Sequence, residues 1–150
     1  MSAAPYVAVV GAGGDAAPEV LAIAEAVGAE LARRGAVVVT GGLGGVMEAA
    51  CRGARSGGAL TLGILPGDDR AAANAFVSVA VATGMGELRN GLVVRSADAL
   101  IAIAGEHGTL SEIALALKAG KRVIGIASWE IDGVRPAQDA VEAVALALAR

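Results

Sequence analysis

The stretch AIAGEHGTLSEIALALKAGKRVIG, residues 102–125, joins the end of one apolar run to the start of another. A glycine turn and a helical pattern separate the two runs, and the helical pattern ends at Ala119 and Gly120. Both runs are of strand length and contain β-branched residues, which favour strands. A strand, a helix and a second strand in this order predict a right-handed crossover between parallel strands.

The same alternation extends over the whole chain. Pro18 suits the first turn of a predicted helix, and Gly35 suits its end. We predict strands at 6–12, 36–42, 60–67, 77–84, 99–105 and 122–127, and helices at 17–35, 45–58, 86–97, 109–119 and 137–150, with a loop at 68–76. The fold class is therefore α/β: one Rossmann-like domain over residues 1–150, with a parallel sheet and helices on both faces.

Composition narrows the classes of partner. The chain has 150 residues, of which 55% are hydrophobic and only 2% aromatic, and its net charge is −3. With no block of like charges and few aromatic side chains for stacking bases, we expect no nucleic-acid partner. Cys51 is the only cysteine, which excludes a disulfide framework and a thiolate metal cluster, and we expect it to be a buried structural thiol.

The sequence contains no pattern typical of a membrane span or a signal peptide. The first apolar run is of strand length and ends in a glycine turn, and no longer apolar stretch reaches the length of a membrane helix. We therefore expect a cytoplasmic protein without a membrane partner. We expect no bound metal.

Glycines gather where predicted strands end and helices begin. The candidate ligand-binding glycines are Gly11, Gly13, Gly14, Gly41, Gly42, Gly44, Gly45, Gly105 and Gly108. Short α/β proteins need glycine turns in any case, so each cluster alone has a purely structural explanation. Together, however, they share the sheet edge at which parallel α/β proteins bind ligands, and helix N-termini there attract anions.

Two common nucleotide motifs fit poorly. GAGGDA, residues 11–16, matches the loose form of the dinucleotide fingerprint, but Thr40 and Gly41 stand where that fingerprint expects an acidic residue. The lysine and Ser/Thr of a P-loop are absent. Neither motif accounts for the later glycines.

Three other stretches carry a family resemblance. TGGLGGVMEAA (40–50), AGEHGTLSE (104–112) and GELRN (86–90) resemble motifs of the Lonely Guy family, long labelled lysine decarboxylases. GILPGDD (63–69), TGMGELRN (83–90) and RSADALIAIAG (95–105) are more similar still to a short branch that includes molybdenum cofactor carrier proteins. This resemblance extends from Val7 to about Ile126.

The resemblance implies an oligomeric Rossmann-like protein that binds a phosphorylated small molecule. Lonely Guy enzymes hydrolyse the N-glycosidic bond of nucleoside 5′-monophosphates that carry a modified adenine. Transferred by position, Gly108 and Thr109 would hold phosphate, and Arg89 and Glu112 would be the catalytic pair. A carboxylate beside the ribose would stabilise positive charge and activate water. No cofactor is required, and the molybdenum cofactor would be a carried ligand.

Two positions depart from the family signature. Ala104 replaces a proline, and Glu106 replaces a glycine in the phosphate loop. We expect Glu106 to point outward, because an inward carboxylate would oppose an anion. Thr109 and Glu112 also have the spacing of a capping box, with Thr109 as N-cap, and this role is compatible with ligand contact.

Three hypotheses remain open. A protein that binds or carries a nucleoside monophosphate or a molybdopterin-type cofactor without turnover is favoured, because the resemblance to the carrier branch covers nearly the whole chain. A phosphoribohydrolase is the alternative, since Arg89 and Glu112 are retained. A scaffold with a vestigial site is the third, motivated by Glu106. In each case the apolar helices lead us to expect a homo-oligomer, either a dimer or a tetramer.

Overall fold

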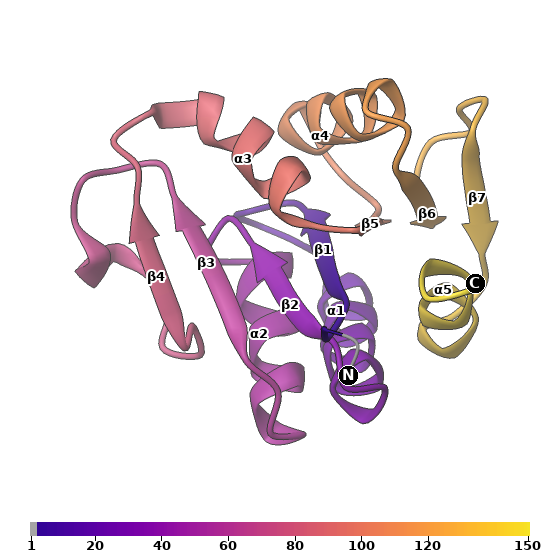
Figure 1. Ribbon diagram of the computed structural model, residues 1–150, viewed down its shortest axis with the longest axis horizontal. Coiled ribbons are helices and arrows are strands. Elements are labelled where there is room, and N and C mark those ends of the chain that lie inside the picture. Colours follow the sequence, from indigo (N-terminus) through magenta and orange to yellow (C-terminus); the bar gives the residue numbers. More distant parts are fainter. Residues whose placement is uncertain (1–2) are drawn as a thin grey trace.

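The computed structural model describes residues 3–150 and contains one seven-stranded sheet in the order β4-β3-β2-β1-β5-β6-β7. Every neighbouring pair of strands is parallel. The strands are β1 (Tyr6–Gly11), β2 (Val37–Thr40), β3 (Thr61–Leu65), β4 (Val79–Ala82), β5 (Ala99–Ile103), β6 (Arg122–Ile126) and β7 (Val134–Ala137). β1 and β5 form the centre, and β4 and β7 form the edges (Figure 1).

Helices cover both faces of the sheet. They are α1 (Pro18–Arg33), α2 (Val46–Ser56), α3 (Arg89–Ser96), α4 (His107–Lys118) and α5 (Ala140–Ala147), with short 3-10 turns η1 (Arg70–Ala72) and η2 (Gly86–Leu88). α1, α2 and α5 lie on one face and α3 and α4 on the other (Figure 1). None of the helices within residues 3–150 combines the length and the apolar character that crossing a bilayer requires.

Strand β1 shows how the sequence builds two hydrophobic cores, one on each face of the sheet. Val7 and Val9 pack with α1, α2 and α5, whereas Ala8 and Val10 pack with α3 and α4. All four are at most 2% exposed. Successive side chains of a strand point to opposite faces, so a strand buried on both faces must be apolar throughout.

The predicted α/β fold with a parallel sheet is confirmed, and two local predictions are wrong. Residues 134–137 form β7, an edge strand, and the last helix begins at Ala140 instead of residue 137. Pro136 obscured this strand, because proline is tolerated at a sheet edge but breaks the usual strand pattern. α4 begins at His107, two residues before the predicted start, because Glu106 is its N-cap and Thr109 occupies the third helical position.

The order of the strands determines where a crevice opens at the edge of the sheet. From β1 the chain proceeds outward to β4, then returns to β5 beside β1 and continues outward to β7. Gly11 at the end of β1 is in register with Ile103 at the end of β5. This is the topological switch point, at which connections diverge and ligands bind in open α/β sheets.

Candidate functional site

A cavity of about 220 Å³ lies at the switch point. Its walls come from the loops after β1, β2 and β5 and from the starts of α3 and α4. The lining residues are Val9, Val10, Gly11, Gly13, Gly41, Leu43, Met47, Arg89, Asn90, Glu106, Gly108, Thr109 and Glu112.

The cavity unites most, but not all, of the residues predicted to bind a ligand. Those that line it are Gly11, Gly13, Gly41, Arg89, Gly108, Thr109 and Glu112. Those that do not line it are Gly14, Gly42, Gly44, Gly45 and Gly105. The second group lies in the same loops, so sequence alone could not separate the two groups.

Gly44 and Gly45 bring two loops together. A Cβ atom on Gly45 would lie 2.2 Å from the carbonyl oxygen of Ala12, and one on Gly44 would lie 3.2 Å from that of Gly13. The Val46 N–H donates to the Ala12 oxygen at 2.9 Å. These glycines therefore permit close packing of backbone on backbone, which a side chain would prevent.

Arg89 extends its guanidinium group into the wall of the cavity. Nη1 donates to Oδ1 of Asn90, and Nη2 donates weakly to the Gly41 oxygen at 3.4 Å. Nε is buried and has no hydrogen-bond partner among residues 3–150. Burial lowers the pKa of Arg89, and the nearby Glu112 partly opposes this shift. A buried donor without a partner is costly, which favours an acceptor supplied by a ligand.

Glu112 is a buried acid beside this arginine. It is only 7% exposed, and no hydrogen bond to its carboxyl group is formed within residues 3–150. Burial raises the pKa of Glu112 from 4.5 to about 7, although the charge of Arg89 acts in the opposite direction. Near neutral pH the group therefore exists in both its charged and its neutral form, which suits either proton transfer or contact with an anion.

The shifted acid predicts how stability depends on pH. The folded state holds the Glu112 proton more tightly than the unfolded state. The resulting contribution of Glu112 to the free energy of unfolding is fully present below pH 4.5 and is lost as pH rises through about 7. The loss is on the order of 3 kcal/mol. In Glu112→Gln, the free energy of unfolding in urea should fall less between pH 5 and 8 than in the wild type. Parallel pH profiles for the two proteins would contradict the shift.

The expectation that Glu106 points outward is wrong. The residue is exposed, but its Oε1 accepts a hydrogen bond from the Gly13 N–H at 3.1 Å. Glu106 also caps α4: its N–H donates to Thr109 Oγ1 at 3.3 Å, and its side chain faces the Thr109 N–H in a capping box. The predicted capping box between Thr109 and Glu112 is therefore displaced by three residues. Local spacing allowed both arrangements, whereas the contact with Gly13 comes from 93 residues away.

The other departure from the signature has a backbone explanation. Ala104 has φ 47°, in the left-handed region. Proline, with φ fixed near −65°, could not occupy this position. The Ala104 N–H donates to the Ile126 oxygen at 2.9 Å, which anchors the loop to the end of β6.

Asn90 is a site residue that the sequence analysis did not single out for a ligand. It is 8% exposed, accepts from Arg89, and its Nδ2 lies 3.5 Å from Ser111 Oγ. It thus connects α3 to α4 behind the cavity. Its position directly after Arg89, within the GELRN stretch, was the available signal.

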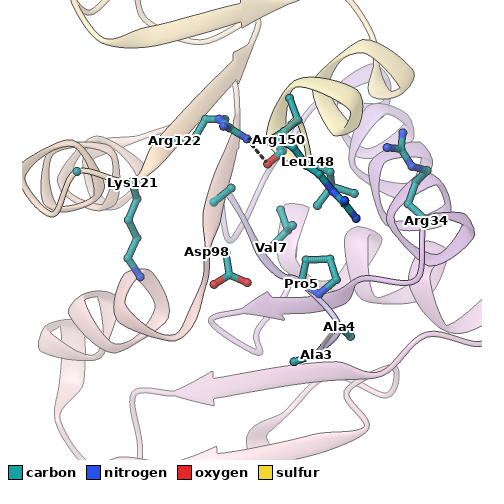
Figure 2. A pocket seen from close by; sticks show the side chains of 14 residues that line it. Ala3, Ala4, Pro5, Val7, Arg34, Asp98, Lys121, Arg122, Leu148 and Arg150 are labelled. Carbon is teal, nitrogen blue, oxygen red and sulfur yellow. Dashed lines mark hydrogen bonds between the residues drawn. The ribbon is translucent and has the colours of Figure 1, made fainter. Parts of the chain in front are cut away.

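A larger hollow of about 1040 Å³ lies at the opposite edge, where β1, β5 and β6 begin (Figure 2). Two of its four cationic side chains, Lys121 and Arg122, have structural partners. Lys121 Nζ donates to Val94 at the end of α3 at 2.7 Å, and Arg122 Nη1 donates to Ala147 at the end of α5 at 3.1 Å. Cations stabilise the unpaired carbonyls at helix C-termini, so helix capping accounts for the charge of these two side chains.

Comparison with known proteins agrees with the resemblance to the carrier branch. The model of the SLOG cluster4 family matches residues 4–147. A protein of Archaeoglobus fulgidus is 45% identical over 139 residues, which are 92% of this chain and 91% of that protein.

Two solved structures are similar over nearly their full length. The molybdenum cofactor binding protein from the phototrophic bacterium Rippkaea orientalis has a TM-score of 0.91 and 35% identity, covering 97% of this chain and 96% of that one. The molybdenum cofactor carrier protein from Chlamydomonas reinhardtii has a TM-score of 0.86 and 32% identity, covering 95% of each chain.

Proposed function

The chain belongs to the SLOG cluster4 family, and on that basis we propose that it binds a phosphorylated small molecule of the molybdenum cofactor type and carries it without converting it. One observation carries the proposal. A cavity at the switch point combines backbone amides, the start of α4, a buried acid, and an arginine whose buried Nε–H has no partner within residues 3–150. Such a set suits a ligand that is anionic at one end.

The phosphate would lie at the start of α4. Gly108 and Thr109 are in the first turn of this helix, where N–H groups without a backbone partner inside the helix and the helix dipole favour an anion. Arg89 reaches the same cavity from α3 and would supply charge-assisted hydrogen bonds, including one from Nε, which has no partner in the described part of the chain. The remaining glycines predicted to bind would shape the loops around it.

The rest of the ligand would extend out of the cavity. A volume of about 220 Å³ is small for a whole cofactor, since ligand sites usually measure roughly 300–1,000 Å³. An adjoining hollow of about 450 Å³ between α3 and α4 shares Asn90 and Gly108 with the cavity. Its apolar walls include Leu88 and Leu115 and would suit a flat heterocycle.

Carriage without turnover agrees with the state of Glu112. Below about pH 7 its carboxyl group is neutral, so it would not repel an anionic ligand and could donate a hydrogen bond to it. In the alternative function, phosphoribohydrolysis, the same group would act as a general base once ionised. The common location of Arg89 and Glu112 supports this second candidate.

Calorimetric titration tests for binding, and an assay for adenine release distinguishes the two functions. We expect molybdenum cofactor to bind the purified protein and to be recovered chemically unchanged. We expect no adenine release when the protein is incubated with AMP and analysed by chromatography. Adenine release by the wild type that disappears in Glu112→Gln would instead support the hydrolase. Absence of heat with the cofactor, nucleotide monophosphates and phosphate would contradict both and favour the vestigial scaffold.

We also propose that copies of the chain associate into a dimer or tetramer. Val79 and Val81 of the edge strand β4 expose 51% and 44% of their surface, and Met85, shortly after that strand, exposes 44%. Exposed apolar groups on neighbouring elements are typical of subunit interfaces. Light scattering at several concentrations measures the subunit count.

A further inference from the structure

Glu106 makes with its side chain the contacts that a bound anion would make. Its Oε1 accepts from the Gly13 N–H at 3.1 Å, and its side chain faces the Thr109 N–H at the start of α4. Both residues line the cavity at the switch point, as does Glu106 itself. The carboxylate therefore occupies the Gly13 donor and lies in front of the Thr109 donor, both of which are available for a ligand.

The topology accounts for this contact. β1 and β5 are neighbours, and Gly11 is in register with Ile103, so the loops that follow these strands face each other. Gly13 lies on the first loop and Glu106 on the second. A glutamate at the N-cap of α4 has the length to cross between them, whereas the glycine of the family signature would leave the donors open.

Two independent features indicate that the cavity is built for a ligand in addition to this carboxylate. Arg89 Nε is buried without a hydrogen-bond partner among residues 3–150. Glu112 is 7% exposed, and its carboxyl group lacks a hydrogen bond within the same residues. Glu106 pairs with neither, because its partners are on the other loop and at its own helix start.

A phosphate group and the Glu106 carboxylate cannot both lie in front of the Gly13 and Thr109 N–H groups. Both are anions, and like charges at hydrogen-bonding distance repel strongly. The Glu106 side chain is exposed, so it has room to turn towards solvent and release the donors. Binding therefore requires an exchange of one anion for another.

We propose that Glu106 determines specificity by competing with the phosphate of the ligand. Inorganic phosphate gains few contacts beyond the two donors and is held weakly. A larger phosphorylated ligand also engages Arg89 and the hollow between α3 and α4, and these contacts offset the displacement of Glu106. This inference rests on the proposed function, since it assumes that the ligand places its phosphate at α4.

The test measures the dissociation constant of inorganic phosphate by calorimetry in the wild type, Glu106→Gly and Glu106→Gln. We expect Glu106→Gly to bind phosphate at least about tenfold more tightly, because charge-assisted donors are released. Glu106→Gln keeps an acceptor but loses the charge, so its affinity should lie between the other two. It also tests the proposal should Glu106→Gly not fold.

Asp139→Ala is the matched control. Asp139 is the N-cap of α5 and accepts from the Glu142 N–H at 2.9 Å, so its loss removes a similar cap outside the cavity. Its melting temperature should fall as in Glu106→Gly, whereas its affinity for phosphate should equal that of the wild type.

Tryptophan fluorescence gives a second readout. Trp129 is the only tryptophan, and its ring packs against Gly105, next to Glu106. Saturating phosphate should change its emission in the wild type, where Glu106 must move, and should change it less in Glu106→Gly.

Each outcome has a distinct meaning. Equal or weaker phosphate binding by Glu106→Gly overturns the role of Glu106, and the proposed function stands if the wild type still binds molybdenum cofactor. Tighter phosphate binding by Glu106→Gly with no cofactor binding by the wild type supports competition and removes the proposed ligand. No binding of phosphate or cofactor by any variant overturns both.

Discussion

Arg89→Leu is expected to weaken binding of a phosphorylated ligand by at least about a hundredfold, the scale for losing a desolvated charge-assisted contact. The melting temperature should stay the same or rise. The reason is that Arg89 destabilises the folded protein when no ligand is bound, because burial lowers its pKa and its Nε lacks a partner among residues 3–150. A ligand acceptor would remove that cost. Calorimetric titration with molybdenum cofactor measures the affinity, and thermal unfolding of the same samples measures the melting temperature.

Arg95→Leu is the matched control for this experiment. Arg95 is an exposed arginine in the last turn of the same helix and is not part of the cavity. Its replacement should leave affinity unchanged. If Arg89→Leu bound as tightly as the wild type, or if it lost affinity only by unfolding, Arg89 would be a structural residue.

Gly28→Ala is expected to destabilise the fold by about 3 kcal/mol or more, as severe overpacking does. A Cβ atom on Gly28 in α1 would lie 2.0 Å from the Ala50 oxygen in α2. Conversely, a Cβ atom on Gly53 in α2 would lie 2.0 Å from the Glu25 oxygen in α1. Both obstacles are backbone atoms, so the two helices would have to separate. Urea unfolding measures the loss.

Gly91→Ala separates this packing effect from helix propensity. Gly91 lies in α3, and a Cβ atom there would meet no heavy atom of residues 3–150 within 4 Å. Alanine should therefore stabilise the protein by up to about 1 kcal/mol, the usual difference between the two residues in a helix. A Gly28→Ala protein as stable as Gly91→Ala would show that α1 and α2 do not pack in this way.

Some elements could be predicted because their signals are local. The apolar run of β1 and the helix start at Pro18 depend on neighbouring residues, and both were predicted from the sequence. β7 could not, because its four residues include Pro136 and only Ala137 is buried. Residues 134–137 form a strand because they pair with β6, and their sequence does not alternate between apolar and polar residues.

The site divides in the same way. The sequence by itself determined that Arg89, Gly108 and Glu112 share one edge of the sheet, because each follows a predicted strand and the ends of parallel strands lie together. Only the tertiary structure decided that Glu106 binds the Gly13 N–H and that burial raises the pKa of Glu112 to about 7. Periodicity is set by adjacent residues. The direction of a loop side chain and the removal of water from a carboxyl group depend on atoms brought together from distant parts of the chain.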